Sequence, residues 1–162
     1  MGQVFLQDQN VKQKNVDETD LKIMNLLQED CRLSFNKVAA KTRISVGTAY
    51  NRIKSLETKG YVKGYSVLVD SAKLGYSLTA VIFVQIEGEH LSVVEKEIAQ
   101  KSNVMAVYDV TGEFDAAVIA KFKDREDLSS FIKHIAALVH VKRTITNVSL
   151  ETVKEDFRIK LR

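Results

Sequence analysis

Apolar residues in the first third of the chain recur every three or four positions, which is the spacing of amphipathic helices. The first helix is predicted over residues 17–28, where Leu21, Met24 and Leu27 form the apolar stripe. Asp17 is suited to cap it, because a carboxylate accepts from the unpaired backbone N–H groups of a first turn. This helix is expected to pack across two further helices.

Those two helices follow at once and are joined by a tight turn. Ser34 and Ser45 are suited to cap them, and Gly60 is expected to end the second helix as a C′ residue. Small residues in the first helix of the pair allow the close packing that a helix-turn-helix requires. The residues predicted to face inward are Phe35, Val38 and Ala39 in the first helix and Ala49, Ile53 and Leu56 in the second.

The second helix of the pair also carries a polar face that suits a DNA groove. Asn51 and Arg52 can reach base edges, and Thr48, Ser55 and Lys59 can contact phosphates. A generic amphipathic hairpin with a solvated polar face would show the same spacing. The candidate DNA contacts are Arg43, Ser45, Thr48, Asn51, Arg52, Lys54, Ser55 and Lys59, with Lys41 as a further phosphate contact.

Charge favours the DNA interpretation. Residues 31–65 hold eight basic residues and a single acid, Glu57, whereas residues 71–162 hold 13 basic and 13 acidic residues. The formal net charge of +3 for the whole chain hides this asymmetry. A locally positive field is what phosphate binding requires.

From residue 78 onward the pattern changes to β-type runs separated by two helical stripes. The run at 78–87 is apolar on both faces, so one face is expected to lie on helices and the other against a second subunit. A helix over 92–101 and one capped by Asp124 complete the order β-α-β-β-α-β, the ferredoxin-like split motif of an α+β protein. The predicted strands are 78–87, 104–110, 114–122 and 141–150.

Composition divides the chain into four parts. Residues 1–16 are polar, and we expect a frayed tail or a segment that docks Phe5 on a partner subunit. Residues 17–62 are the predicted winged helix-turn-helix domain, 63–77 a hinge and linker, and 78–162 the βαββαβ domain. The β-rich stretch 61–70 predicts a wing or hinge strand that pairs with its copy in a second subunit, and 71–76 predicts a turn.

The sequence gives no sign of a membrane segment, a metal site or an active site. No apolar run is long enough to cross a bilayer, and no secretory signal pattern is present. The only cysteine, Cys31, cannot form an internal disulfide, so a reducing cytoplasm is expected. The three histidines match no zinc spacing, and no catalytic constellation emerges. We therefore expect no metal, no cofactor and no enzyme activity.

The sequence resembles the Lrp/AsnC, or feast/famine, family of transcription regulators over nearly its whole length from Asp17. A helix-turn-helix alone would be a weak match, but here it precedes a βαββαβ module with a TGxxD turn. The matching segments are DxxDxxI at 17–23, LLQEDCR at 26–32, RIKSLETKGYVKGY at 52–65, LGY at 74–76 and VYDVTGEFD at 107–115.

The resemblance implies a cytoplasmic, sequence-specific transcription regulator that binds double-stranded DNA. Members join a winged helix-turn-helix by a hinge to an effector-binding, oligomerising RAM domain. They form homodimers that often assemble into tetramers or octamers, and many bind a free amino acid between dimers. The alternative is an architectural DNA-binding protein that needs no effector.

Two residues depart from the family pattern. Arg43 stands where the turn often carries glycine, which should alter the turn or add a phosphate contact. Gly47 stands where a larger side chain is usual, which removes one base contact and could allow close approach to the sugar–phosphate backbone.

The resemblance also implies an effector site at the turn between the second and third strands of the βαββαβ module. Backbone N–H groups at a glycine turn and the Thr111 hydroxyl would hold a carboxylate, and Asp109 or Asp115 an ammonium group. Lys133 would mildly favour polar or acidic ligands over basic ones. An ordinary hairpin turn with a solvated acid is the alternative. The implied residues are Asp109, Val110, Thr111, Gly112, Glu113, Phe114, Asp115, Ser129, Lys133, Thr144, Ile145, Thr146, Asn147 and Val148.

Overall fold

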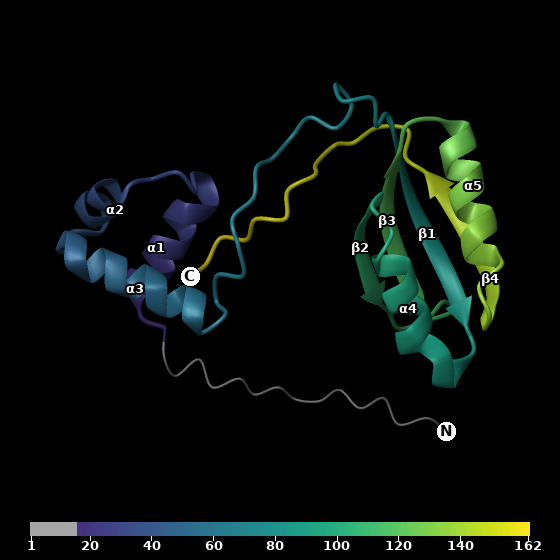
Figure 1. The fold of residues 1–162 in the computed structure, drawn as a ribbon, viewed down its shortest axis with the longest axis horizontal. Coiled ribbons are helices and arrows are strands. Elements are labelled where there is room, and N and C mark those ends of the chain that lie inside the picture. Colours follow the sequence, from purple (N-terminus) through teal and green to yellow (C-terminus); the bar gives the residue numbers. More distant parts are fainter. Residues whose placement is uncertain (1–15) are drawn as a thin grey trace. The chain divides into compact units, whose positions relative to one another are not determined.

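The computed structural model describes residues 16–162, so the expectations for residues 1–15, including the docking of Phe5, lie outside it. The described chain forms two compact units. One holds the residues up to Val67 together with Asp156–Arg162, and the other holds Leu68–Glu155 (Figure 1). The sequence did not predict that the last seven residues belong with the N-terminal helices.

The first unit is built from three helices: α1 (Glu18–Glu29), α2 (Phe35–Thr42) and α3 (Val46–Thr58). All three predicted N-caps are confirmed. The Asp17 carboxylate accepts from the backbone N–H of Asp20 at 2.9 Å, and the Asp20 carboxylate accepts in return from the N–H of Asp17 at 3.2 Å. Ser34 and Ser45 accept from the N–H groups three residues on, at 3.4 and 3.1 Å.

The three helices pack around one apolar cluster. Its buried members are Ile23, Leu27, Val38, Ala39, Ala49, Ile53 and Leu56. The prediction that Phe35 faces inward was wrong, since its side chain is 40% exposed. Its ring instead meets that of Tyr50 edge-on, with 5.2 Å between centroids, on the outside of α2 and α3.

Residues 61–70 pair with no strand of the described chain, so the predicted pairing with a copy in a second subunit stays a prediction. The first two of these residues close the turn that follows α3. Gly60 has a φ of 75°, as expected of a C′ glycine, and turns the chain so that the N–H groups of Tyr61 and Val62 both donate to the carbonyl of Leu56. A lone extended segment has no ladder to stabilise it.

The second unit has the predicted β-α-β-β-α-β order. The strands form one antiparallel sheet in the order β2-β3-β1-β4, as in the ferredoxin-like split motif. The elements are β1 (Leu78–Ile86), α4 (Leu91–Ala99), β2 (Val104–Asp109), β3 (Ala116–Phe122), α5 (Arg125–Ala136) and β4 (Val141–Val148), with a short 3₁₀ turn at Gly88–His90.

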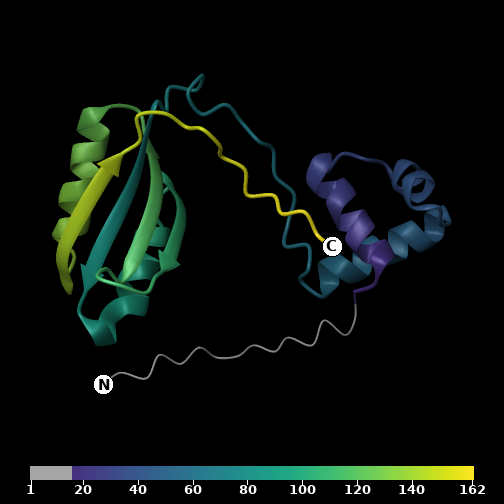
Figure 2. The same cartoon turned by 180° about the vertical axis from the view of Figure 1, so that it is seen from behind.

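Both helices of this unit lie on one face of the sheet (Figure 1), and the view from behind shows the other face without a helix (Figure 2). Alternate residues of β1 and β3 are fully buried under α4 and α5, among them Ile82, Val84 and Val118. On the opposite face, Val81, Phe83 and their neighbours are only half-buried. No helix of residues 16–162 is long and apolar enough to cross a membrane.

Candidate nucleic-acid interface and ligand-binding turn

Helix α3 buries one side in its unit and leaves the other side to solvent. Ala49, Ile53 and Leu56 are buried, as predicted. The side chains of Thr48 and Asn51 are exposed, and Ser55 is half-buried. The exposed positions of the helix are Val46, Gly47, Thr48, Tyr50, Asn51, Lys54 and Thr58. Small and polar side chains therefore occupy the start of this surface, where a helix entering a groove makes its base contacts.

Arg52 is engaged within the protein. Its Nη1 lies 2.7 Å from Asp17 Oδ2 and 2.9 Å from Asp20 Oδ1, and the side chain is 32% exposed. Asp20, followed by Asp17, raises the pKa of Arg52. The N–H of Asp20 and then the Arg52 guanidinium hold the pKa of Asp17 below its usual value. The geometry therefore gives Arg52 a role in joining α3 to the first turn of α1, one that competes with contact to a base.

A second predicted contact is also paired. Lys54 Nζ lies 2.7 Å from Glu57 Oε2, and the other oxygen of Glu57 accepts from the hydroxyl of Tyr65 at 2.8 Å. Lys54 first, and then Tyr65, lower the pKa of Glu57. Burial and the bond to Glu57 raise the pKa of Tyr65 to about 12. Lys54 is thus partly neutralised in the free protein.

Most of the cations between residues 31 and 65 remain available. Of the eight basic residues in that stretch, five are exposed and form no ion pair within residues 16–162: Lys37, Lys41, Arg43, Lys59 and Lys63. Arg43 lies in the turn between α2 and α3, and Lys59 caps the end of α3. Free cations therefore lie near both ends of the exposed helix, where phosphates of a duplex would meet them.

Arg43 keeps the geometry of the turn although it is not glycine. It adopts the left-handed conformation, with φ 59° and ψ 44°, and its N–H donates to the carbonyl of Ala39 as the C-cap of α2. The N–H of Ile44 donates to the same carbonyl at 3.1 Å. A non-glycine residue in this conformation costs roughly 1–2 kcal/mol. The turn is therefore retained under strain, with an exposed guanidinium placed on it.

The predicted ligand-binding turn connects β2 to β3. Gly112 has a φ of 127°, which favours glycine. The N–H of Val110 donates to the carbonyl of Asp115 at 2.9 Å and closes the turn. The carboxylate of Asp115 accepts from the N–H of Ile86 at 2.7 Å, which ties the start of β3 to β1. One Asp115 oxygen is therefore used in the fold.

Strand register separates the remaining predicted residues onto two faces, because paired residues of an antiparallel sheet share a face. Thr144 and Thr146 pair with Val84 and Ile82, so they lie on the helix-covered face. Ile145 pairs with Phe83 and lies on the bare face. The full set therefore cannot line one site within a single chain. Asn147 lies with Ile145 on the bare face, Asp109 and Val148 lie on the helix-covered face, and Ser129 and Lys133 are exposed on α5.

Sequence reasoning missed Arg143, which lies beside this turn. Its Nη1 is 3.3 Å from Glu113 Oε1, and its guanidinium carbon lies 5.7 Å from the centre of the Phe114 ring. The Phe114 ring in turn lies 5.7 Å from that of Phe83. Arg143 lies 30 residues after Glu113 in the sequence, so no short motif contains both residues and the pairing could not be predicted. It brings a cation to the turn on the bare side of the sheet.

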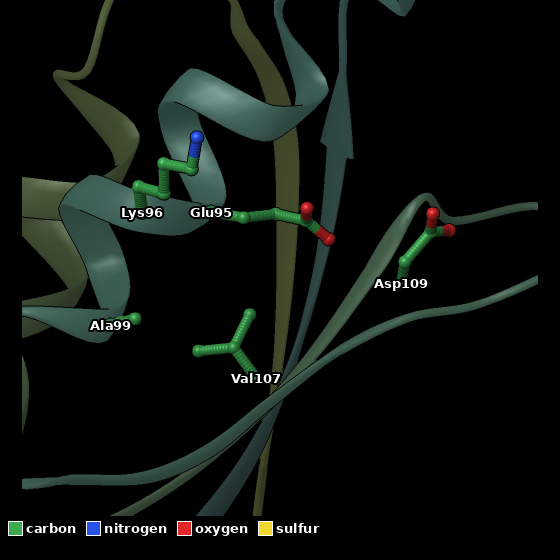
Figure 3. A pocket seen from close by; sticks show the side chains of 5 residues that line it. All are labelled: Glu95, Lys96, Ala99, Val107 and Asp109. Atoms are coloured by element: carbon green, nitrogen blue, oxygen red, sulfur yellow. The ribbon is translucent and has the colours of Figure 1, made fainter.

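A pocket of about 200 Å³ lies on the other side, between α4 and β2, and is lined by Glu95, Lys96, Ala99, Val107 and Asp109. Figure 3 shows Glu95 reaching from its helix toward the end of β2, where Asp109 projects. Glu95 Oε1 is buried without a hydrogen-bond partner. Burial and then the nearby charge of Asp109 raise the pKa of Glu95. Asp109 is the only residue of the predicted effector set in this pocket. Within residues 16–162, no three His, Cys, Asp or Glu residues are grouped so that they could hold a metal ion.

Comparison with protein families assigns both halves of the chain. Residues 16–63 match a winged helix-turn-helix DNA-binding domain, and residues 79–159 match the Lrp/AsnC ligand-binding domain. An uncharacterised HTH-type transcriptional regulator of Pyrococcus furiosus is 48% identical over 144 residues, which cover 89% of this chain and 97% of the relative.

Solved structures show the same fold. A transcriptional regulator of Neisseria meningitidis in complex with L-Met has a TM-score of 0.80 at 25% identity, over 89% of this chain and 96% of that one. AsnC of Escherichia coli has a TM-score of 0.81 at 19% identity, over 90% of this chain and 99% of that one. The α+β architecture expected from the sequence is therefore confirmed.

Proposed function

The chain is a DNA-binding transcriptional regulator of the Lrp/AsnC family rather than an enzyme, and we propose that it acts on specific duplex sites as a homo-oligomer whose assembly or DNA binding responds to an amino acid. The observation that carries the proposal is the surface of α3. It leaves Thr48 and Asn51 exposed, while unpaired cations lie near both of its ends.

The proposed roles of the DNA-binding residues follow from which side chains are exposed and which are held in ion pairs within the protein. Asn51 is the proposed reader of base edges, since its amide can donate and accept at once. Ser45 and Thr48, whose hydroxyl oxygens lie 2.8 Å apart, and half-buried Ser55 add hydroxyl contacts. Lys41, Arg43 and Lys59 are the proposed phosphate contacts, and Lys54 joins them if it leaves Glu57. Arg52 acts indirectly, by holding α3 on α1.

Selection of bound duplex fragments from genomic DNA, with and without amino acids, tests the proposal. We expect a limited set of related sites with half-sites about one helical turn apart. Asn51→Ala should relax the preference at one position and leave the salt dependence unchanged. Lys142→Ala, an exposed change in the other unit, is the control. Recovery of random fragments alone would favour an architectural protein that wraps DNA without an effector.

Pairing of two copies is supported by the bare face of the sheet. Val81, Phe83, Ile119 and Ile145 lie there half-buried and without a covering helix. An uncovered apolar face of this kind favours association with a second copy. We propose a dimer through this face that assembles further into tetramers or octamers. Phe83→Asp should shift the mass measured by light scattering toward a single subunit, and an unchanged mass would overturn the assignment.

The amino-acid site is proposed at the β2–β3 turn. The L-Met complex of the Neisseria regulator supports a ligand of this class. Backbone N–H groups around Gly112, the Thr111 hydroxyl and the Arg143 guanidinium are suited to a carboxylate, and the exposed carboxylate of Glu113 is suited to an ammonium group. Because the predicted residues lie on two faces of one sheet, a single chain offers only part of the site. The proposal therefore places the ligand between dimers.

Calorimetric titration with the twenty amino acids tests the effector. We expect binding of neutral or acidic amino acids and its loss in Thr111→Val, with Thr79→Val as a control on β1. Tight binding of lysine or arginine would contradict the selectivity assigned to Lys133. The lack of binding by any amino acid would support the effector-independent alternative.

A further inference from the structure

Two amide side chains on α1 hold the last part of the chain. Asn25 Nδ2 donates to the carbonyl of Leu161 at 2.9 Å, and Asn25 Oδ1 accepts from the N–H of the same residue at 3.0 Å. Likewise, Gln28 Nε2 donates to the carbonyl of Ile159 at 2.9 Å, and Gln28 Oε1 accepts from the N–H of Ile159 at 3.0 Å. Four hydrogen bonds of ordinary length therefore join a helix face to a segment more than 130 residues away in sequence.

The spacing of the two elements explains the match. Asn25 and Gln28 are three positions apart, so they lie on one face of α1. In an extended chain, the N–H and C=O of alternate residues point to the same side, as those of Ile159 and Leu161 do here. Each side-chain amide has an NH2 group that donates and an oxygen that accepts, which fits the C=O and the N–H of a single residue.

Around Ile159 the contact depends on the main chain and little on side chains, whereas Leu161 is half-buried. Ile159 is 68% exposed and Phe157 is 60% exposed, so neither contributes much apolar burial. Arg158 is occupied with Asp156, at 2.9 and 3.1 Å. An extended segment held by its backbone is a recognised mode of peptide binding, in which the hydrogen bonds supply the affinity.

We propose that Asn25 and Gln28 form a main-chain clamp whose occupant is this chain's own C-terminal segment. The chain leaves the first unit, which carries the helix-turn-helix and is called here the DNA-binding unit, after Val67 and returns to it at Asp156. The residues between form the second, ligand-binding unit. The clamp thus gives the ligand-binding unit a second connection to the DNA-binding unit, attached to α1 rather than to α3. Four hydrogen bonds that are exposed or only partly buried are weak enough to open without unfolding either unit.

Amide hydrogen exchange on the full-length protein tests the clamp in the absence of DNA and effector, so its result is independent of the proposed function. The readouts are the N–H groups of Ile159 and Leu161, with the N–H of Thr48, which is bonded to Ser45, as a reference for the unit. Gln28→Glu keeps the shape but loses the donor to Ile159. We expect exchange at both tail amides to rise about fivefold with Thr48 unchanged, which the loss of one hydrogen bond of about 1 kcal/mol supplies. Lys22→Gln on the exposed side of α1 is the control.

A pair of changes in the segment itself separates main-chain from side-chain recognition. Ile159→Ala keeps the backbone N–H and should leave exchange at Leu161 unchanged. Ile159→Pro removes that N–H and should raise exchange at Leu161 about tenfold. Equal effects of the two changes would overturn the clamp, as would slow exchange that survives Gln28→Glu. Protection that disappears on dilution would overturn the assignment to the same chain, because it would mean that a second copy supplies the segment.

Discussion

The Nη1 atom of Arg52 lies 2.9 Å from Oδ1 of Asp20, a carboxylate whose residue is 8% exposed on α1. The pair joins the helix that presents the DNA-binding surface to the first turn of the unit. Without the guanidinium, Asp20 would keep a hydrogen bond from the N–H of Asp17 but lose its cation.

We therefore predict that Arg52→Ala lowers the free energy of unfolding by about 2 kcal/mol, the typical cost of leaving a largely buried charge unpaired. Chemical denaturation followed by circular dichroism measures this. Asn51→Ala, its exposed neighbour, should leave stability unchanged and weaken DNA binding. If Arg52→Ala weakened DNA binding at unchanged stability, Arg52 would be a direct contact after all.

Arg43 offers a way to separate strain from charge. Arg43→Gly should raise stability by about 1 kcal/mol, because glycine adopts the left-handed conformation without the cost that a side chain brings. Arg43→Ala keeps that cost and should leave stability near that of the unchanged protein. Both variants lose the guanidinium, so both should bind DNA more weakly. Equal stability of the two variants in thermal denaturation would contradict the strain at this turn.

Gly47 has open space around it, because a Cβ added there meets no atom within 4 Å. Gly47→Ala should therefore stabilise α3, and with it the free protein, by about 0.5–1 kcal/mol. If the glycine serves close approach to the sugar–phosphate backbone, the same change should weaken DNA binding. Thr58→Ala, at the far end of α3, is the control. A stabilised variant that binds DNA unchanged would show that close approach is not needed.

The helices of the DNA-binding unit could be predicted because their signals are local. Asp17, Ser34 and Ser45 each cap a helix through a residue three positions on. The role of Arg52 could not be predicted in this way. Periodicity gives its position on α3, whereas its partner Asp20 lies 32 residues earlier and depends on how α1 crosses α3.

In the ligand-binding unit, too, the features with local signals could be predicted and those that depend on distant residues could not. The apolar run of β1 and the glycine turn at 112 predicted the strands and their order. They did not reveal that register puts Thr146 and Ile145 on opposite faces of the sheet, nor that Arg143 comes beside Glu113. The contacts of the last residues could not be predicted, because the partners of Ile159 and Leu161 lie on α1, more than 130 positions away.

The pocket between α4 and β2 gives a prediction about pH. Because burial and Asp109 raise the pKa of Glu95, the folded state binds a proton at this site more readily than the unfolded state does. Its contribution therefore favours folding at low pH and is lost as pH rises from the ordinary value of a glutamate to the raised one. Glu95→Gln should raise the Tm at pH 7, with a gain that shrinks toward pH 4. Glu97→Gln, exposed on the same helix, is the control, and equal gains at both pH values would contradict this account.

If the free cations around α3 hold duplex DNA, as we claim, the affinity for a duplex must fall with salt in proportion to the phosphates they contact. The measurement is the affinity of the full-length protein for a duplex over a range of salt concentrations, beside a variant with Lys41, Arg43 and Lys59 changed to Gln. We predict that the slope of log affinity against log salt becomes shallower by about 0.9 for each phosphate contact removed. An unchanged slope, or an unmodified protein that ignores duplex DNA at low salt, would contradict the claim.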